Sequence, residues 1–215
     1  MPRPSQREQI LAAARRLFRE KGYHGTTIRE IAEEAGVLSG SLYAHIQSKE
    51  DLLFEIADEG ARAFLAAAAD TERRPGPAVE RMRHGLRSHI RVIADHLDAA
   101  TVFFHEWRSL SGERRAWIQA KRDEYEAFWA RLLEAGVAEG ALSVADARFA
   151  RLLLLSAANW VYQWYRPDGA LSPEEIADHL WRLLLNGLAA PGAGVREKEG
   201  KTCDTDALHT LHGAH

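Results

Sequence analysis

Side chains suited to the recognition of nucleic acid gather in one short segment near the N-terminus. Hydroxyl groups, an imidazole and an ammonium group can bond to phosphate oxygens or base edges, and a glycine allows close backbone approach. A tyrosine offers a hydroxyl to a phosphate and a ring to a thymine methyl group. We predict that the DNA-contacting residues are Thr27, Ser39, Gly40, Ser41, Tyr43, His45 and Lys49.

Two short helices separated by a tight turn would position these side chains. Thr27 and Glu30 have the spacing of a capping box, which predicts a helix start at residue 27. Gly36 ends this helix, because glycine adopts positive φ without strain. In a second short helix Leu42 and Ile46 point one way, which leaves the polar residues for another surface. This arrangement is typical of a helix-turn-helix.

The run over residues 41–53, SLYAHIQSKEDLL, is specific enough to suggest a family. It resembles the TetR family of bacterial transcriptional repressors, whose usual run is S/T-L-Y-x-H-F-x-x-K-E-x-L. Leu38 stands where the family often has a serine that caps the recognition helix, so we expect Ser39 to cap instead. Ile46 replaces the usual Phe. The resemblance implies an all-α protein with a three-helix N-terminal DNA-binding domain and a larger helical domain for ligand binding and dimerisation.

A second group of residues, in the C-terminal half, suits a small-molecule pocket. All 6 Trp lie beyond residue 100, and Trp160 and Trp164 are four residues apart. An aromatic core explains several of these rings, but Trp and Tyr carry polar atoms that a plain core would have to satisfy. Such a mixture is typical of an apolar pocket with a few orienting polar groups. The predicted ligand-binding residues are Phe103, Phe104, Trp107, Arg108, Arg122, Tyr125, Trp129, Asn159, Trp160, Gln163, Trp164 and Arg166.

Three further runs extend the resemblance: HEWR at 105–108, RDEYE at 122–126 and NWVYQWYRPDG at 159–169. They are similar to one TetR branch, which regulates steroid-ring and fatty-acid catabolism and senses acyl-CoA thioesters. The resemblance therefore implies an acyl-CoA effector. Its phosphates need cations, for which Arg108, Arg122 and Arg166 are candidates. Arg166 also has a purely structural explanation, because a cation at a helix C-terminus interacts favourably with the helix dipole.

Composition sets limits on the class of protein. Of the 215 residues, 46% are hydrophobic, which is enough for a real core, and the net charge is −3. The DNA-binding prediction therefore rests on the motif and not on bulk charge. The sequence has no run of about 20 apolar residues, no signal-peptide core and only one cysteine, Cys203. We expect a cytoplasmic protein without a membrane partner.

Neither a metal site nor a resident cofactor is predicted. His209, His212 and His215 recur every third residue near Cys203, a spacing that would suit zinc or nickel on a stable helix. The tail has no apolar face, so a disordered segment or a remnant of an expression tag explains it more simply. The sequence also lacks a phosphate loop, a dinucleotide fingerprint and a Gly-x-Ser-x-Gly motif, so an enzyme is not expected.

Helical patterns divide the chain into two domains. We expect a DNA-binding domain at 1–47, an effector-binding and dimerisation domain at 48–190, and a disordered tail at 191–215. Helix 48–73 would link the two domains. Further helices are expected at 78–97, 99–110, 113–139, 144–165 and 172–190. The last two have leucine-rich faces that need a partner, so we place the dimer interface there, at Leu180, Leu184 and Leu188.

Together these patterns predict a homodimeric transcriptional regulator. Because one short recognition helix reads few base pairs, a palindromic operator with two half-sites needs two copies. We expect a repressor that a small apolar effector, an acyl-CoA thioester by resemblance, releases from DNA. The alternatives are a repressor that responds to drugs or other hydrophobic ligands, an acyl-CoA or lipid carrier without regulated DNA binding, and an architectural DNA-binding protein. The sequence specifies neither the operator nor the exact effector.

Overall fold

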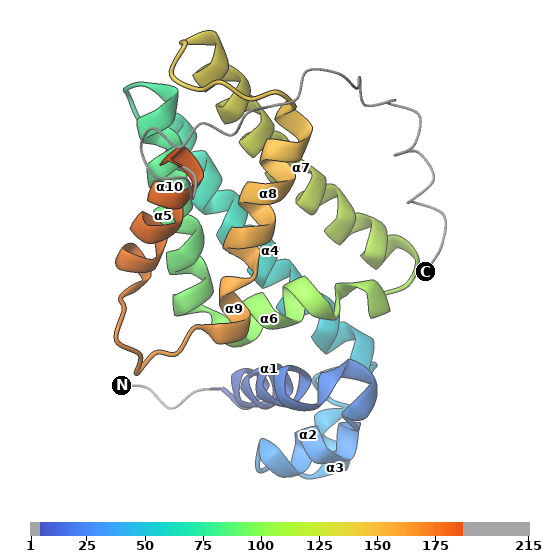
Figure 1. The fold of residues 1–215 in the computed structure, drawn as a ribbon. Helices are drawn as coiled ribbons and strands as arrows, with labels where there is room; N and C mark the ends of the chain where they lie inside the picture. The colour runs from blue at the N-terminus through green and yellow to red at the C-terminus, as the bar shows by residue number, and fades with distance from the viewer. Residues whose placement is uncertain (1–4, 187–215) are drawn as a thin grey trace, which may run out of the picture.

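The computed structural model describes residues 5–186, which form helices and connecting loops without a strand (Figure 1). The predicted all-α fold is confirmed. The elements are α1 (Gln6–Gly25), α2 (Ile28–Glu34), α3 (Ser39–Leu42), α4 (Lys49–Arg73), α5 (Ala78–Asp95), α6 (Leu97–His105), the 3₁₀ turn η1 (Trp107–Ser109), α7 (Gly112–Ala138), α8 (Ala147–Asn159), α9 (Val161–Trp164) and α10 (Pro173–Asn186). Leu188, Cys203, His209, His212 and His215 lie outside the described residues, as does the predicted tail at 191–215.

Local capping defines the helix starts of the N-terminal domain. Ser5, Thr27 and Ser48 each form a reciprocal capping box with the carboxylate three residues later. These boxes satisfy main-chain N–H groups that a helix start otherwise leaves unpaired. Gly36 takes a φ of 68° in the turn after α2, as predicted. The domain closes around buried Ile10, Phe18, Ile31 and Leu42.

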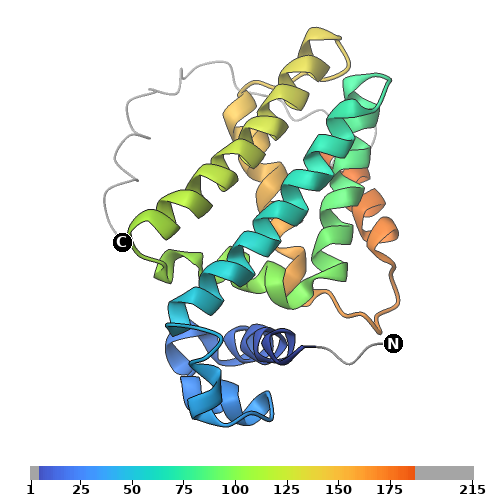
Figure 2. The same cartoon turned by 180° about the vertical axis from the view of Figure 1, so that it is seen from behind.

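Helix α4 connects the two domains. It starts beside α1 and α3 and runs into the larger helical domain, where it packs against α5, α6 and α7 (Figures 1 and 2). At Gly60 the approach to α6 is close, because an added Cβ would lie 3.1 Å from the Cβ of Phe103. The helix that carries the recognition domain is therefore in direct contact with the helix that carries Phe103.

The larger domain is a helical bundle with an aromatic centre. Phe64 of α4, Leu86 of α5 and Phe128 and Trp129 of α7 are among its most deeply buried side chains. Helix α10 packs along α5, and Asp178 accepts hydrogen bonds from Arg87. These contacts position α8, α9 and α10 on one side of the bundle (Figure 1).

Two local expectations were wrong. The predicted helix 144–165 is divided at Trp160, where ψ is −14° and the α-helical hydrogen bonding is interrupted between α8 and α9. Ser39 does not cap α3: it is the first residue of the helix, and Leu38 occupies the cap position without a side-chain hydrogen bond. A leucine side chain has no acceptor atom for the free N–H groups of the helix start.

Candidate DNA-binding surface and effector site

The recognition helix α3 presents an exposed edge of the molecule. Ser39 and Gly40 are exposed, and Tyr43, which follows the last residue of α3, has 59% of its surface accessible. Leu38 is 82% exposed beside them. On the opposite side Leu42 is fully buried. One face of this segment therefore anchors it in the core while the other is free to enter a groove of DNA.

A glutamine that the sequence analysis missed fixes two of the predicted DNA-contacting residues. Gln6, at the start of α1, donates from Nε2 to the Ser41 hydroxyl at 3.3 Å. Its Oε1 lies 3.1 Å from Nε2 of His45. Helix α1 therefore contacts the recognition helix at Ser41 and the loop after it at His45. No local pattern indicates this role, because Gln6 is far from Ser41 and His45 in the chain.

Thr27 combines exposure with a capping role. Its hydroxyl accepts from the Glu30 N–H at 3.2 Å and donates to the Glu30 carboxylate at 2.9 Å. Hydrogen bonds from Lys21 and from Thr27 hold the pKa of Glu30 at about 2. The start of α2 is thus capped by side chains of the same turn.

Lys49 is not the free cation that the sequence suggested. Its ammonium group donates to the main-chain carbonyls of Tyr23 and Thr26, each at 2.7 Å, and lies 4.3 Å from the centre of the Tyr23 ring. Burial lowers the pKa of Lys49. Two of its three N–H donors are therefore already bound to the C-terminal end of α1, which leaves one for a contact with DNA.

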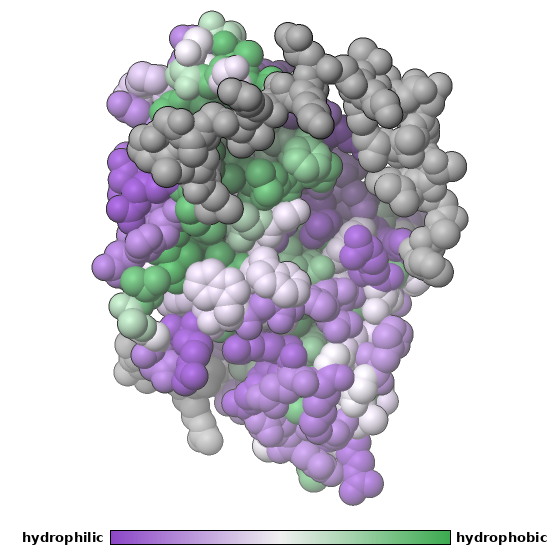
Figure 3. Space-filling view, in the orientation of Figure 1, coloured by the Kyte–Doolittle hydropathy of each residue, from purple (hydrophilic) through white to green (hydrophobic). Residues whose placement is uncertain are grey.

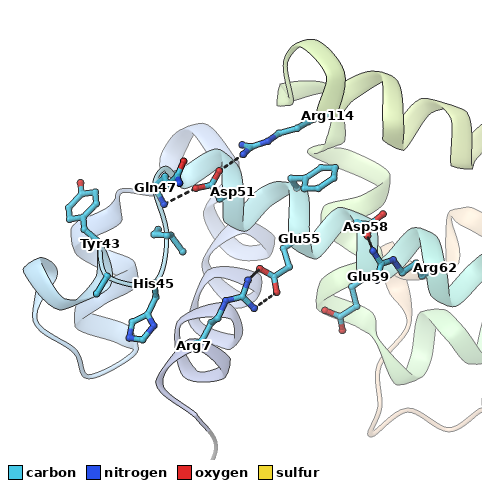
Figure 4. A pocket seen from close by; sticks show the side chains of 13 residues that line it. Arg7, Tyr43, His45, Gln47, Asp51, Glu55, Asp58, Glu59, Arg62 and Arg114 are labelled. Atoms are coloured by element: carbon cyan, nitrogen blue, oxygen red, sulfur yellow. Dashed lines mark hydrogen bonds and ion pairs between the residues drawn. The ribbon is translucent and has the colours of Figure 1, made fainter.

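A groove of about 940 Å³ separates the recognition segment from the effector domain (Figure 4). Tyr43 and His45 lie at one end of it, and ion pairs cross it. Arg7 of α1 forms a double hydrogen bond with Glu55 of α4, at 2.6 and 2.5 Å. The recognition domain is therefore joined to α4 by ionic contacts as well as by apolar packing.

Seven of the predicted ligand-binding residues lie close together in the effector domain: five aromatic residues, and the arginines Arg108 and Arg122 described below. Phe103, Trp107, Tyr125 and Trp129 are buried, and Phe104 is half-buried. The Phe103 and Phe104 rings lie 5.4 Å apart, and both contact Phe64. The centre of the Tyr125 ring lies 5.5 Å from that of Phe64 and 6.3 Å from that of Trp129. We call Phe64, Phe103, Phe104, Tyr125 and Tyr162 the aromatic cluster.

Two arginines lie close to one ring, that of Trp107, at the edge of this cluster. The guanidinium of Arg122 lies 4.9 Å from the Trp107 ring centre and 5.1 Å from that of Phe103. Arg108 lies 5.1 Å from the Trp107 ring centre. Burial and the neighbouring Arg108 lower the pKa of Arg122. Within residues 5–186 neither arginine forms an ion pair, so their positive charge is not directly neutralised.

The remaining predicted ligand-binding residues are mostly exposed. Trp160 and Trp164 are 61% and 48% exposed. Arg166 is exposed and pairs with Asp168 at 3.2 Å, and exposed Gln163 bonds to His105 and Tyr162. Asn159 is half-buried. Trp160 is nevertheless in contact with the aromatic cluster, because its ring centroid lies 6.5 Å from that of Tyr162, and a shared ligand pocket stays a prediction.

An exposed apolar face covers α8, α9 and α10 (Figure 3). Its members are Phe149, Leu152, Leu153, Trp160, Trp164, Leu183 and Leu185. Leu180 and Leu184, the residues predicted at a dimer interface, are instead half-buried against the protomer's own core. A groove of about 400 Å³ lined by Leu153, Trp181 and Leu184 lies next to this face. The predicted helices are exposed, but different leucines occupy their outer surface.

Comparison with known proteins identifies the family. Residues 10–56 match the profile "Bacterial regulatory proteins, tetR family", and residues 75–188 match "Tetracyclin repressor-like, C-terminal domain". The chain belongs to the TetR family. The first match contains the helix-turn-helix, and the second contains the exposed apolar face and every member of the aromatic cluster except Phe64. Members of the TetR family are transcriptional regulators, and this protein is a regulator rather than an enzyme.

Individual TetR relatives agree over most of the chain. The HTH-type transcriptional repressor KstR2 of Rhodococcus jostii (strain RHA1) is 32% identical over 191 residues, which cover 86% of this chain and 92% of that protein. The structure of the ketosteroid transcriptional regulator KstR2 of Mycobacterium tuberculosis superposes with a TM-score of 0.81 at 26% identity, over 86% of this chain and 96% of that one. A structure of AibR in complex with isovaleryl coenzyme A and operator DNA superposes with a TM-score of 0.75 at 31% identity, over 84% of this chain and 98% of that one.

The described part of the chain has neither a metal-binding group of side chains nor a membrane-spanning helix. Residues 5–186 contain no group of three or more His, Cys, Asp or Glu side chains arranged to hold a metal ion. Among the helices of the same residues, none combines the length and the apolar character needed to cross a membrane.

Proposed function

We propose that this TetR protein is a homodimeric repressor that an acyl-CoA thioester releases from a palindromic operator. The observation that carries the effector class is the pair of arginines, Arg108 and Arg122, that lie close to Trp107 at the edge of an aromatic cluster. A coenzyme A thioester has the matching halves, because its phosphates are anionic and its acyl group is apolar. The AibR structure shows that a relative 31% identical binds such a molecule together with operator DNA.

The arginines are suited to phosphate. Arg122 is half-buried and close to a like charge, and both effects lower its pKa. An anion placed between Arg108 and Arg122 would relieve this repulsion and form charge-assisted hydrogen bonds. Both guanidinium groups already lie within 5.1 Å of the Trp107 ring centre, so part of their side-chain entropy is lost before the ligand binds.

The acyl group would enter the aromatic cluster. Its rings lie in mutual contact, with centroids between 5.4 and 5.6 Å apart for Phe64, Phe103 and Phe104. An inserted apolar group would therefore have to separate rings carried by α4 and α6. The ligand can shift the equilibrium only by binding the separated state more tightly than the packed state.

Helix α6 provides the route from the effector to the DNA-binding domain. Its Asp98 accepts a hydrogen bond from Arg19 of α1 at 2.6 Å. Ser109, which follows α6 in η1, lies 3.1 Å from Nε2 of His24 at the end of α1. A displacement of α6 would thus move α1, and through Gln6 it would move the recognition helix. In a dimer this change alters the distance between the two recognition helices.

The DNA-contacting residues are proposed from exposure and position. Ser39, Gly40 and Tyr43 would read the groove, and Ser41 and His45 would do so in the orientation set by Gln6. Thr27 would contact a phosphate at the start of α2. Lys49 has one N–H donor left for the same purpose.

The exposed apolar face of α8, α9 and α10 is the proposed dimer interface. A contiguous surface of this kind usually marks a contact with another protein. In a symmetric pair Phe149, Leu153 and Leu183 of one protomer would meet the same patch of its partner.

The experiment begins with an operator selected from random DNA by the purified protein. Fluorescence anisotropy then measures its affinity with added acyl-CoA, the free acid or coenzyme A alone. We expect release by the thioester, with a much weaker effect of the free acid. Arg122→Met should bind the operator normally and lose the response. Arg131→Met is the matched control, because Arg131 is exposed on the same helix and pairs with Glu72. Release by a planar cationic drug, with no response to thioesters, would overturn the proposal.

A further inference from the structure

One deeply buried polar side chain in the effector domain takes part in neither a helix cap nor an ion pair. The deeply buried polar or charged residues of the described chain are Thr26, Asp58, Thr71 and His89. The two threonines bond to nearby main-chain carbonyls, and Asp58 forms ion pairs and accepts from an indole N–H. His89 is fully buried in the middle of α5, away from any helix start and from any ion pair.

His89 is paired with a second buried polar group. Its Nδ1 lies 2.8 Å from the hydroxyl oxygen of Tyr125, which α7 carries. The imidazole is 4.9 Å from the ring of Phe64 and 6.3 Å from that of Phe104. The pair therefore lies among rings from four helices. Apolar residues at both positions would avoid the free-energy cost of desolvating two polar groups, so packing alone does not explain the pair.

The pair is uncharged and can donate a hydrogen bond. Burial lowers the pKa of His89 to about 3, against a weaker opposite effect of the Ala158 main chain. Burial also raises the pKa of Tyr125, so its hydroxyl keeps its proton. If Nδ1–H donates to the tyrosine oxygen, the phenolic proton is available for an acceptor. The reverse tautomer leaves the same oxygen able to accept from a hydroxyl.

The pair lies at the far end of a row of rings that starts at the arginines. The guanidinium of Arg122 is 5.1 Å from the centre of the Phe103 ring. The ring centres of Phe103 and Phe64 are 5.6 Å apart, and those of Phe64 and His89 are 4.9 Å apart. The row thus has positive charge at its outer end, apolar rings along it and a neutral hydrogen-bonding pair at its inner end.

We propose that His89 and Tyr125 bind a carbonyl or hydroxyl oxygen on the apolar part of the effector, so that the protein distinguishes oxygenated acyl groups from plain hydrocarbon ones. This inference rests on the function proposed above and adds the effector's second polar group. A site built to bond an oxygen discriminates strongly against an analogue that lacks it, because its own polar groups are left unpaired.

The test uses two probes: a bicyclic acyl-CoA that bears a ring ketone, and the same thioester with a methylene in place of the ketone. Calorimetry of the full-length protein should give a Kd about tenfold lower for the ketone. Tyr125→Phe removes only the hydroxyl and should abolish this preference while it retains binding of the methylene probe. His89→Phe should do the same. Thr71→Val is the control, because it removes another buried hydroxyl of this domain and should keep the preference.

The outcomes separate the two proposals. Equal affinity of the wild-type protein for both probes, with operator release by each, would overturn this inference and leave the proposed function standing. The same ketone preference in wild type and in both folded variants, judged by circular dichroism, would also overturn it. Failure of both probes to bind or to release the operator would overturn both proposals.

Discussion

Leu153→Ala should weaken the dimer by an amount that follows from its exposure. Leu153 is 54% exposed in the protomer, whereas its neighbour Leu154 is buried. Full burial of a leucine contributes about 1.5–3 kcal/mol, so covering the exposed half contributes about 1 kcal/mol per protomer. A symmetric dimer contains two copies, which gives about 2 kcal/mol and a dimer Kd raised about 30-fold. Leu153→Glu should have a larger effect, because it would bury two carboxylates against apolar surface.

Sedimentation equilibrium over a dilution series measures this constant. The folded protomer should be unaffected, because Leu153 lies on its surface, so the circular dichroism spectrum should not change. Leu38→Ala is the control: Leu38 is even more exposed, yet it belongs to the recognition segment and should leave the dimer constant unchanged. If both Leu153 variants dimerise as tightly as wild type, the exposed face of α8, α9 and α10 is not the interface.

Three further predictions concern single side chains. Tyr43→Ala should weaken operator binding by about 1–3 kcal/mol in an anisotropy titration without a change in fold, and unchanged affinity would remove Tyr43 from the DNA-binding surface. Lys49→Met should lower the stability of the N-terminal domain, because two hydrogen bonds from a charged group are lost. The slope of the salt dependence of DNA binding should also decrease by about one unit per half-site, because the remaining N–H donor contacts a phosphate, and an unchanged slope would show that Lys49 only holds the end of α1. His89 has a lower pKa folded than unfolded, so the unfolded chain binds the extra proton between pH 6.5 and about 3. The free energy of unfolding should therefore decrease as the pH is lowered through this window, by up to about 1.4 kcal/mol per pH unit. Urea titrations at pH 7 and pH 5 should show a smaller difference between the two pH values for His89→Phe than for wild type. An unchanged difference in this variant would contradict the assignment.

Features that depend on neighbouring residues could be predicted from the sequence. The capping boxes at Thr27 and Ser48 and the positive φ of Gly36 all form within one turn of chain. The motif over residues 41–53 then indicated the family, which the comparisons confirm. At Leu38 the local reasoning failed, because α3 starts there without a side-chain cap.

Features that depend on tertiary packing could not be predicted in this way. Helical spacing placed Trp160 and Trp164 on one face, but it did not reveal that both rings are largely exposed. For the same reason Leu184 was predicted on the outer surface of its helix, whereas the structure has Leu184 half-buried and Leu183 exposed. Gln6 bonds to Ser41 across 35 positions of chain, and Lys49 reaches the carbonyl of Tyr23 across 26. Such contacts exist only after the helices have packed.

The most direct test of the central claim is the affinity of the dimer for its selected operator, measured with and without a saturating acyl-CoA thioester. A ligand that favours the non-binding state must lower this affinity by the ratio of its own affinities for the two states. We predict that the operator Kd rises at least about tenfold with the thioester in the wild-type protein and does not change in Arg122→Met. An operator Kd that is the same with and without the thioester, under conditions where the thioester is shown to bind, would contradict the account.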